Sequence, residues 1–257
     1  MKSGLTYALE RAFDRFVVQP RRLKAWERKS GLFDYKNSDG LRFRLDSREY
    51  IDKEIYCNGV YERRFLEFVR SGLTADSIAL DIGANIGNHA IYLAQFINAV
   101  HSFEPNPTII PRLEANVSMN RLKGKVVVHP VGLGKTSETL TFRDNNDGNL
   151  GGSGFLKPGE TPGETDRVHS LNVEAGDDYI EKIGLSRVDF IKMDVEGWEP
   201  DVFEGLTNTI ARYRPVVAFE FHGQLAAKDD FSRIAATLPD YVFAERVTRS
   251  HSRISQR

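Results

Sequence analysis

Residues 79–89, ALDIGANIGNH, contain the pattern that decides the fold of this chain. An apolar run ends in the carboxylate of Asp81, the glycines Gly83 and Gly87 follow, and helical spacing of apolar residues begins at His89. A strand, a tight glycine turn and a helix in this order form the opening unit of a nucleotide-binding α/β sheet.

A second acid follows at the spacing expected for a ribose contact. The short apolar segment 100–103 leads to Glu104, which lies 21 residues after Gly83. A carboxylate at this point of a nucleotide-binding sheet accepts hydrogen bonds from both hydroxyl groups of a ribose. The two segments together predict that the chain binds a nucleoside.

The glycine spacing and Asp81 discriminate among nucleotide ligands. Dinucleotide sites contain G-x-G-x-x-G, where the backbone approaches a pyrophosphate, whereas here three residues separate Gly83 from Gly87. A carboxylate repels a pyrophosphate and attracts a cation. S-adenosylmethionine (SAM) fits, because it carries ribose, adenine, an ammonium and a sulfonium but no phosphate. The alternative is a purely structural turn with surface acids.

Composition is that of an ordinary globular protein. The chain has 257 residues, of which 40% are hydrophobic and 28% charged, and a formal net charge of −1, which predicts one α/β domain with an N-terminal addition. Charge near zero gives no argument for a nucleic-acid partner. The single cysteine, Cys57, excludes an internal disulfide. Without a membrane-length apolar run or a signal-peptide pattern, we expect a cytoplasmic protein with no transmembrane segment.

Residues 1–58 are predicted to be an N-terminal helix-and-strand extension. Residues 5–18 have the spacing of an amphipathic helix, and residues 41–45 alternate as a strand. Basic residues cluster at 21–29. Two interpretations of this basic segment stay open: peripheral contact with a membrane or a partner, and simple packing on the main domain.

Residues 59–257 are predicted to form the main domain. Helices and strands alternate along it, which indicates a doubly wound, mostly parallel, Rossmann-like sheet. The segment 143–167 is polar and glycine-rich, and we interpret it as loops that either cover a site and select its substrate or have no role. Asp177 and Asp178 are expected to cap a helix that ends at Lys182.

Two later strands end in polar side chains. Ligands of open α/β sheets bind beyond the carboxyl ends of the strands, so we expect these side chains to share a crevice with Asp81 and Glu104. The alternative is a salt-bridged surface cluster. The polar residues are Asp194, Glu196, Glu220 and His222.

Together these motifs resemble the FkbM type of SAM-dependent methyltransferase. The resemblance covers residues 61–222, includes Asn116 and Asn120, and rests on the segments 80–87 (LDIGANIG), 103–107 (FEPNP), 191–199 (IKMDVEGWE) and 219–222 (FEFH). It implies a class I methyltransferase fold. The chain departs from the family pattern at its C-terminal end: only one clear strand follows Glu220, so we expect the usual final antiparallel hairpin to be short or incomplete.

The resemblance also implies a cofactor site. Glu104 would contact the ribose. Pro105, Asn106 and the turn at Val131 and Gly132 would lie near the adenine. The implied cofactor-binding residues are Glu62, Asp81, Gly83, Ala84, Asn85, Gly87, Glu104, Pro105, Asn106, Val131, Gly132 and Asp194. Family members typically methylate hydroxyl groups of sugars, glycolipids or polyketide-type products, which implies a small-molecule or carbohydrate acceptor.

Methyl transfer requires alignment of the acceptor oxygen and removal of its proton. We predict His222 as the base, because an imidazole titrates nearest to neutral pH, with Glu220 or Asp194 orienting it or holding the acceptor. A second version uses a divalent ion on Asp194, Glu196, Glu220 and His222, oxygen-rich ligands that suit Mg²⁺ on a diol. The sequence leaves both versions open.

The sequence disfavours two other classes of function. An NAD-dependent sugar oxidoreductase is disfavoured by the missing G-x-G-x-x-G and by the absence of a Tyr-x-x-x-Lys pair. A non-catalytic binding module is disfavoured because Asp81, Glu104 and Asp194 are all present. Nucleic-acid methylation lacks both a basic stripe and the tetrapeptide that holds a flipped base. The oligomeric state and the identity of the acceptor stay open.

Overall fold

The computed structural model describes residues 19–145, 152–157, 159–164, 166–220, 227–247 and 251–256. The predicted helix at 5–18 and the predicted base His222 lie outside these residues. Among the helices that are described, none is both long enough and apolar enough to span a lipid bilayer.

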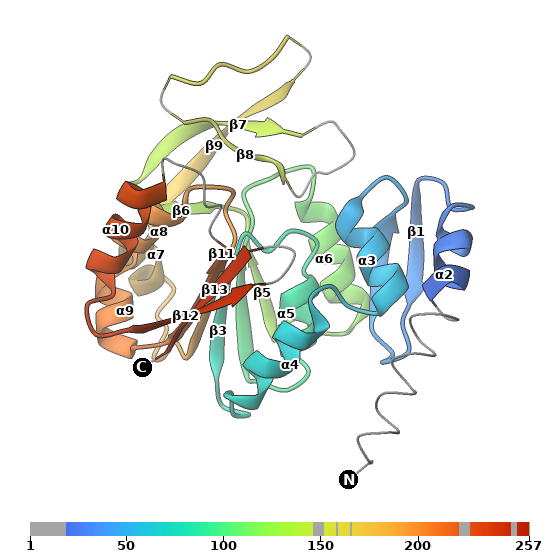
Figure 1. The fold of residues 1–257 in the computed structure, drawn as a ribbon, viewed down its shortest axis with the longest axis horizontal. Helices are drawn as coiled ribbons and strands as arrows, with labels where there is room; N and C mark the ends of the chain where they lie inside the picture. Colours follow the sequence, from blue (N-terminus) through green and yellow to red (C-terminus); the bar gives the residue numbers. More distant parts are fainter. Residues whose placement is uncertain are drawn as a thin grey trace.

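Within these residues, a seven-stranded sheet forms the centre of the molecule (Figure 1). Its spatial order is β12 (Val242–Val247), β13 (His251–Gln256), β11 (Val216–Glu220), β10 (Phe190–Met193), β3 (Ile78–Ile82), β4 (Ala99–Phe103) and β5 (Val126–His129). The five strands from β11 to β5 are parallel. The prediction of a doubly wound, mostly parallel sheet is therefore confirmed.

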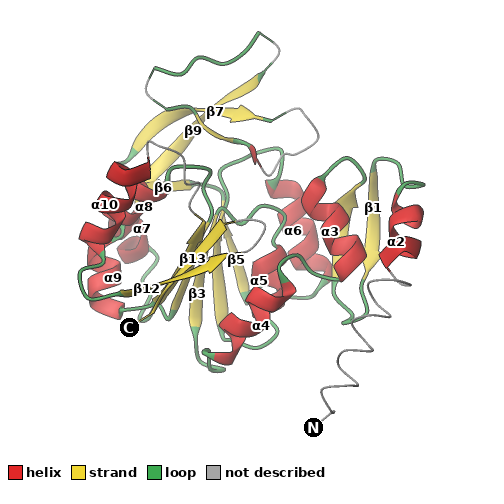
Figure 2. Ribbon diagram, in the orientation of Figure 1, coloured by secondary structure: helices red, strands yellow, loops and turns green. Residues whose placement is uncertain are grey.

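Helices cover both faces of this sheet (Figure 2). One face carries α4 (Arg63–Ser71), α5 (Asn88–Leu93) and α6 (Ile110–Met119), and the other carries α7 (Gly176–Lys182), α8 (Glu199–Gly205), α9 (Thr207–Tyr213) and α10 (Ala227–Thr237). A parallel strand between two helical layers is covered on both faces, which explains why all five residues of β3 are buried.

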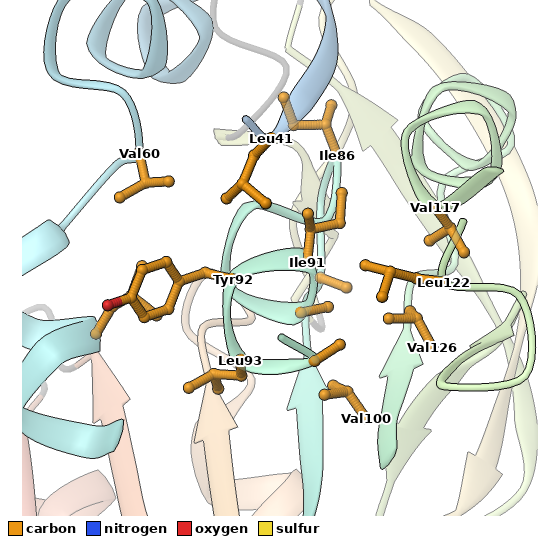
Figure 3. Packing of buried hydrophobic residues seen from close by; sticks show 14 of the residues in the cluster. Leu41, Val60, Ile86, Ile91, Tyr92, Leu93, Val100, Val117, Leu122 and Val126 are labelled. Carbon is orange, nitrogen blue, oxygen red and sulfur yellow. The ribbon is translucent and has the colours of Figure 1, made fainter. Parts of the chain in front are cut away.

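Neighbouring residues of each strand contribute to two separate hydrophobic clusters, because side chains alternate between the faces of a sheet. Ala79 belongs to the first cluster and Leu80 to the second. Figure 3 shows the first cluster packed around α5, with Ile91 pointing toward Ile86 and Leu122, and with Val117 of α6 on the same side.

The end of the chain differs from the prediction. β13 lies between β11 and β12 and pairs antiparallel with both, so the expectation of a short or incomplete final hairpin is wrong. The sequence 251–256, HSRISQ, lacks the apolar alternation of a typical strand. Its backbone pairs with a strand on each side. Backbone pairing does not require an alternating pattern of side chains, so the sequence did not predict this strand.

The expected cap of α7 is also wrong. Asp177 accepts the backbone N–H groups of Asn208 and Thr209, both at 2.8 Å, at the start of α9. It therefore caps a neighbouring helix in space and not the helix in which it lies.

A second sheet lies over the carboxyl edge of the first (Figure 1). Its order is β6 (Gly132–Gly134), β9 (Arg167–Ala175), β7 (Glu138–Asp144) and β8 (Gly154–Phe155). Strands β7 and β9 form a seven-residue antiparallel ladder. Part of the segment expected to be loop at 143–167 is thus strand.

The N-terminal extension packs against α6. It contains α2 (Gln19–Trp26), β1 (Leu32–Lys36), β2 (Arg42–Asp46) and α3 (Tyr50–Asn58). Its side chains Phe43 and Ile55 are fully buried in the first hydrophobic cluster. A buried ion pair between Asp52 and Arg112 joins α3 to α6. The domain boundary after residue 58 stays a prediction.

Asn116 of α6 and Asn120, which directly follows this helix, both bind the backbone of β2. Asn116, fully buried, accepts from the N–H of Arg44 at 2.6 Å and donates to the carbonyl of Ile86 at 2.9 Å. Asn120 accepts from the N–H of Arg42 at 2.9 Å and donates to its carbonyl at 2.6 Å. Asn116 therefore links β2 of the extension to Ile86 in the turn after β3.

Replacing Asn116 tests this attachment. Asn116→Ala should lower the free energy of unfolding by about 2 kcal/mol or more, because it leaves polar groups of Arg44 and Ile86 without partners and each such group costs about 1–3 kcal/mol when buried. Asn120→Ala is the matched control, since water replaces its exposed bonds. Urea unfolding measures both variants, and an equal or larger loss for Asn120→Ala would contradict the assignment.

Candidate active site

A cavity of about 240 Å³ lies beyond the carboxyl ends of β3, β4, β10 and β11. Many of the predicted site residues line it: Gly83, Ala84, Asn85, Glu104, Pro105, Asn106, Val131, Gly132, Asp194, Glu196 and Glu220. Three other predicted residues, Glu62, Asp81 and Gly87, lie close by but do not line it. The structure therefore brings the strand-end residues together as the topology predicts.

Gly83 allows two turns to touch by their backbones. Its φ is +74°, and a Cβ at this position would lie 1.8 Å from the carbonyl oxygen of Asp194. Any side chain would separate the turn after β3 from the turn after β10. Gly87 also has a positive φ, +86°, which favours glycine, and a Cβ there would lie 2.6 Å from Cδ1 of Leu113 in α6.

Glu104 is held by two backbone donors. Its Oε2 accepts the N–H of Asn85 at 2.8 Å, and its Oε1 accepts the N–H of Asn106 at 2.9 Å. The side chain is 6% exposed, and burial raises its pKa to about 7. Each carboxylate oxygen has a second lone pair, so Glu104 can still accept hydrogen bonds from a ligand in the cavity.

A buried ammonium lies beside the glycine turn. Lys192 Nζ donates to the carbonyl of Gly83 at 2.8 Å and lies 3.5 Å from Asp81 Oδ1 and 3.7 Å from Asp194 Oδ2. Burial opposes the charge, but the surrounding carboxylates, first Asp194 and then Asp81, hold the pKa of Lys192 above its ordinary value. Asp81 thus faces a protein cation behind the turn. No pattern in the sequence indicates this partner.

Two carboxylates near this ammonium have oxygens without hydrogen-bond donors. Both oxygens of Asp81 and Oδ1 of Asp194 are buried and accept no hydrogen bond from the described part of the chain. Asp194 lines the cavity, whereas Asp81 does not. An acceptor oxygen in this state is costly unless a donor reaches it, so Asp194 Oδ1 suits a cationic or hydroxyl group of a ligand.

The turn after β10 is shaped by a second buried acid. Glu199 is 2% exposed and accepts the N–H groups of Val195 and Gly197 at 3.1 and 3.3 Å. Between them, Glu196 has a φ of +54°, a conformation that costs free energy in a residue with a side chain. Burial, aided by the charges of Asp194 and Glu199, raises the pKa of Glu196 to about 7.

Glu62 does not line the cavity but contacts a residue that does. Its Oε2 lies 3.2 Å from Nε2 of His89, and His89 lines the cavity together with Tyr61. Asn88 accepts from the N–H of Tyr61 and donates to its carbonyl, at 2.9 and 3.1 Å. These contacts join the segment before α4 to the start of α5. The family resemblance marks Glu62, whereas no sequence pattern predicts His89 and Tyr61 as lining residues.

Aromatic side chains form part of the cavity wall. Phe155 of β8 packs edge-on against Phe142 and Trp198, with ring centroids 5.1 and 5.9 Å apart. The indole N–H of Trp198 donates to the carbonyl of Phe155 at 2.9 Å. A Cβ on Gly132 would lie 3.0 Å from the Phe155 ring. The segment that includes β8 is therefore part of the cavity wall.

The residues named for a divalent ion are not arranged as a metal site in the described residues. No group of three or more histidine, cysteine, aspartate or glutamate side chains converges there, although Asp194, Glu196 and Glu220 all line the cavity. The fourth residue of that set, His222, is outside the described ranges.

Comparison with known proteins identifies the family. The pattern of the Methyltransferase FkbM domain matches residues 81–244, more than half of the chain. The chain is 31% identical over 207 residues to the AMB antimetabolite synthetase AmbE of Pseudomonas aeruginosa, covering 67% of this chain and 9% of AmbE. It is 30% identical over 154 residues to the hexuronic acid methyltransferase AglP of Haloferax volcanii, covering 60% of this chain and 59% of AglP.

A solved structure supports the fold. The methyltransferase FkbM of Methylobacillus flagellatus superimposes with a TM-score of 0.52 at 19% identity, over 79% of this chain and 52% of that protein. The chain thus spans less than two thirds of the length of both curated relatives and of this structure. On the match over residues 81–244, the chain belongs to the FkbM methyltransferase family.

Proposed function

We propose that this protein is a SAM-dependent O-methyltransferase whose acceptor is a hydroxyl group of a carbohydrate or another small molecule. The observation that carries the proposal is the fixed carboxyl of Glu104, which faces the cavity at the end of β4 beside the glycine turn. Family membership supports methyl transfer. It does not support the alternative of an NAD-dependent oxidoreductase.

The residues of the cavity fit the groups of SAM. Glu104 suits the ribose hydroxyls as an acceptor, and the buried Oδ1 of Asp194 suits the ammonium as an acceptor that has no other donor. Val131, Gly132 and Phe155 offer an apolar surface for the adenine. In this proposal Asp81 and Gly87 support the turn from behind, and Glu62 acts through His89.

The name of one relative supports a carbohydrate acceptor, since AglP is a hexuronic acid methyltransferase. The cavity wall offers aromatic surface from Phe155 and Trp198 and acceptor groups from Glu196 and Glu220, a combination that suits a sugar with an apolar face and several hydroxyl groups.

In this mechanism SAM supplies a methyl group that is already activated by the positive sulfur. The protein aligns the acceptor oxygen with that methyl group and removes the hydroxyl proton. His222 stays our proposed base, with Glu220 or Asp194 orienting it or holding the acceptor. Whether a divalent ion assists on Asp194, Glu196, Glu220 and His222 is tested by activity after exhaustive chelation.

Glu104→Gln tests the cofactor site. Glutamine has one acceptor oxygen where the carboxylate has two, so it cannot accept from both Asn85 and Asn106, and the variant loses the charge that strengthens hydrogen bonds from the ribose. A hydrogen bond to a charged group contributes about 1.5–3 kcal/mol, so affinity for S-adenosylhomocysteine should fall about 10- to 100-fold. Calorimetry measures this, with Glu114→Gln on the exposed face of α6 as the control. Unchanged affinity in a folded Glu104→Gln protein would contradict the role.

The acceptor class is tested by transfer of a labelled methyl group from SAM. Two glycosides that differ in one carboxylate, p-nitrophenyl glucuronide and p-nitrophenyl glucoside, serve as a matched pair. We expect label in at least one of them. Label in neither, from protein that binds S-adenosylhomocysteine, would contradict a carbohydrate acceptor and favour a binding module or another small molecule.

His222→Ala tests the base. With the acceptor that accepts label, the variant should lose about 100-fold in kcat, because general-base catalysis contributes about 10²–10⁴-fold. Its affinity for S-adenosylhomocysteine should not change. Glu220→Gln is measured beside it, since that carboxylate is the other candidate to contact the acceptor. Turnover of His222→Ala within a few-fold of the wild type would remove His222 from the mechanism.

A further inference from the structure

Asp144 is a buried carboxylate that the proposed mechanism does not use. It ends strand β7 of the second sheet and is 1% exposed. It does not line the cavity itself, although its partner Asn106 does. Burying a carboxylate costs free energy unless several donors satisfy it, so its partners indicate what it does.

The partners of Asp144 come from two different parts of the chain. Oδ1 accepts from Nδ2 of Asn106 at 2.8 Å. Oδ2 lies 3.2 Å from Oγ1 of Thr108, which donates to it, and 3.0 Å from Nε2 of His169. Asn106 and Thr108 belong to the connection between β4 and α6, whereas His169 lies on β9, across the ladder from Phe142.

The orientation of the Asn106 amide is fixed by these contacts. Its Oδ1 accepts the N–H of Thr108 at 2.8 Å, and its Nδ2 donates to Asp144. A carboxylate accepts and a backbone N–H donates, so only one orientation of the amide satisfies both neighbours. The side chain is fully buried, and no room is left for it to turn while both partners stay in place.

The backbone of Asn106 links these contacts to the proposed cofactor site. Its backbone N–H donates to Oε1 of Glu104 at 2.9 Å. The other oxygen of Glu104 is held separately by Asn85. A chain of contacts therefore runs from His169 through Asp144 and Asn106 to Glu104, and it joins the second sheet to the carboxyl that we assign to the ribose.

We propose that Asp144 is a positioning residue for the cofactor: it fixes Asn106, and through Asn106 it holds the Glu104 carboxyl in place. This inference rests on the proposed function, because it assigns Asn106 and Glu104 to the cofactor. The same contacts couple the second sheet to the cofactor, so occupancy of the site by the cofactor stabilises β7 and β9.

Asp144→Ala and Asp144→Asn separate positioning from general stability. Asp144→Ala releases the Asn106 amide, and affinity for S-adenosylhomocysteine should fall at least tenfold. Asp144→Asn keeps an oxygen that accepts from Asn106, so its affinity should stay within about threefold of the wild type. Thr139→Ala is the control, because Thr139 also lies on β7 and its side chain bonds Asn172 of β9 at an exposed position. Its affinity for S-adenosylhomocysteine should stay within twofold of the wild type.

A double-variant comparison tests whether Asp144 acts through Glu104. In the Glu104→Gln background, Asp144→Ala should weaken S-adenosylhomocysteine binding by less than twofold more. A further tenfold loss there would show that Asp144 acts by another route and would overturn the inference. Affinity of folded Asp144→Ala within twofold of the wild type would overturn it as well.

Hydrogen exchange on the wild-type protein tests the coupling without any variant, and so it applies even if Asp144→Ala does not fold. Amides of residues 138–144 and 167–175 should exchange more slowly when S-adenosylhomocysteine is bound. Unchanged exchange in protein that binds the compound would overturn the coupling alone and leave the proposed function standing. Wild-type protein that does not bind S-adenosylhomocysteine would overturn the proposed function and this inference together.

Discussion

The buried ammonium of Lys192 is the interaction on which the carboxyl edge of the sheet depends. It donates to the carbonyl of Gly83 and lies between the carboxylates of Asp81 and Asp194. These acids would repel each other in a medium of low dielectric. With the cation between them, the turns after β3 and β10 can approach until only a glycine fits, which is where Gly83 meets the backbone of Asp194.

The sequence predicted the parts of the site that depend on local backbone rules. The glycine turn, the acid after β4 and the acids after β10 and β11 are marked by residue type and by their place at strand ends. Asp81 shows the limit of such rules: its spacing suggested direct attraction of a ligand, but its charge faces Lys192. Which partner a buried charge finds depends on packing between strands that lie far apart in the sequence.

The same limit explains what was missed in the fold. β13 has no apolar pattern, and its place follows from backbone pairing with β11 and β12. Asp177 stands where a cap of α7 is expected, yet it accepts from the N–H groups of α9. Asn116 and Asn120 belong to the family resemblance, but nothing in their spacing indicates that they bind the backbone of β2. In each case the deciding partner is remote in sequence.

The pairing of β3 with β10 has a consequence for how the protein folds. Ile78 on β3 donates to Asp189 just before β10, although 111 residues separate them. Closing so long a loop is slow, because the chain loses conformational entropy before the stabilising contacts between the strands form. The first strand, its glycine turn and α5 can form early, but the cavity has no second wall until β10 joins them. The cavity is therefore complete only when this long-range pairing has formed, and a ligand that binds the complete cavity stabilises the paired state of the central sheet.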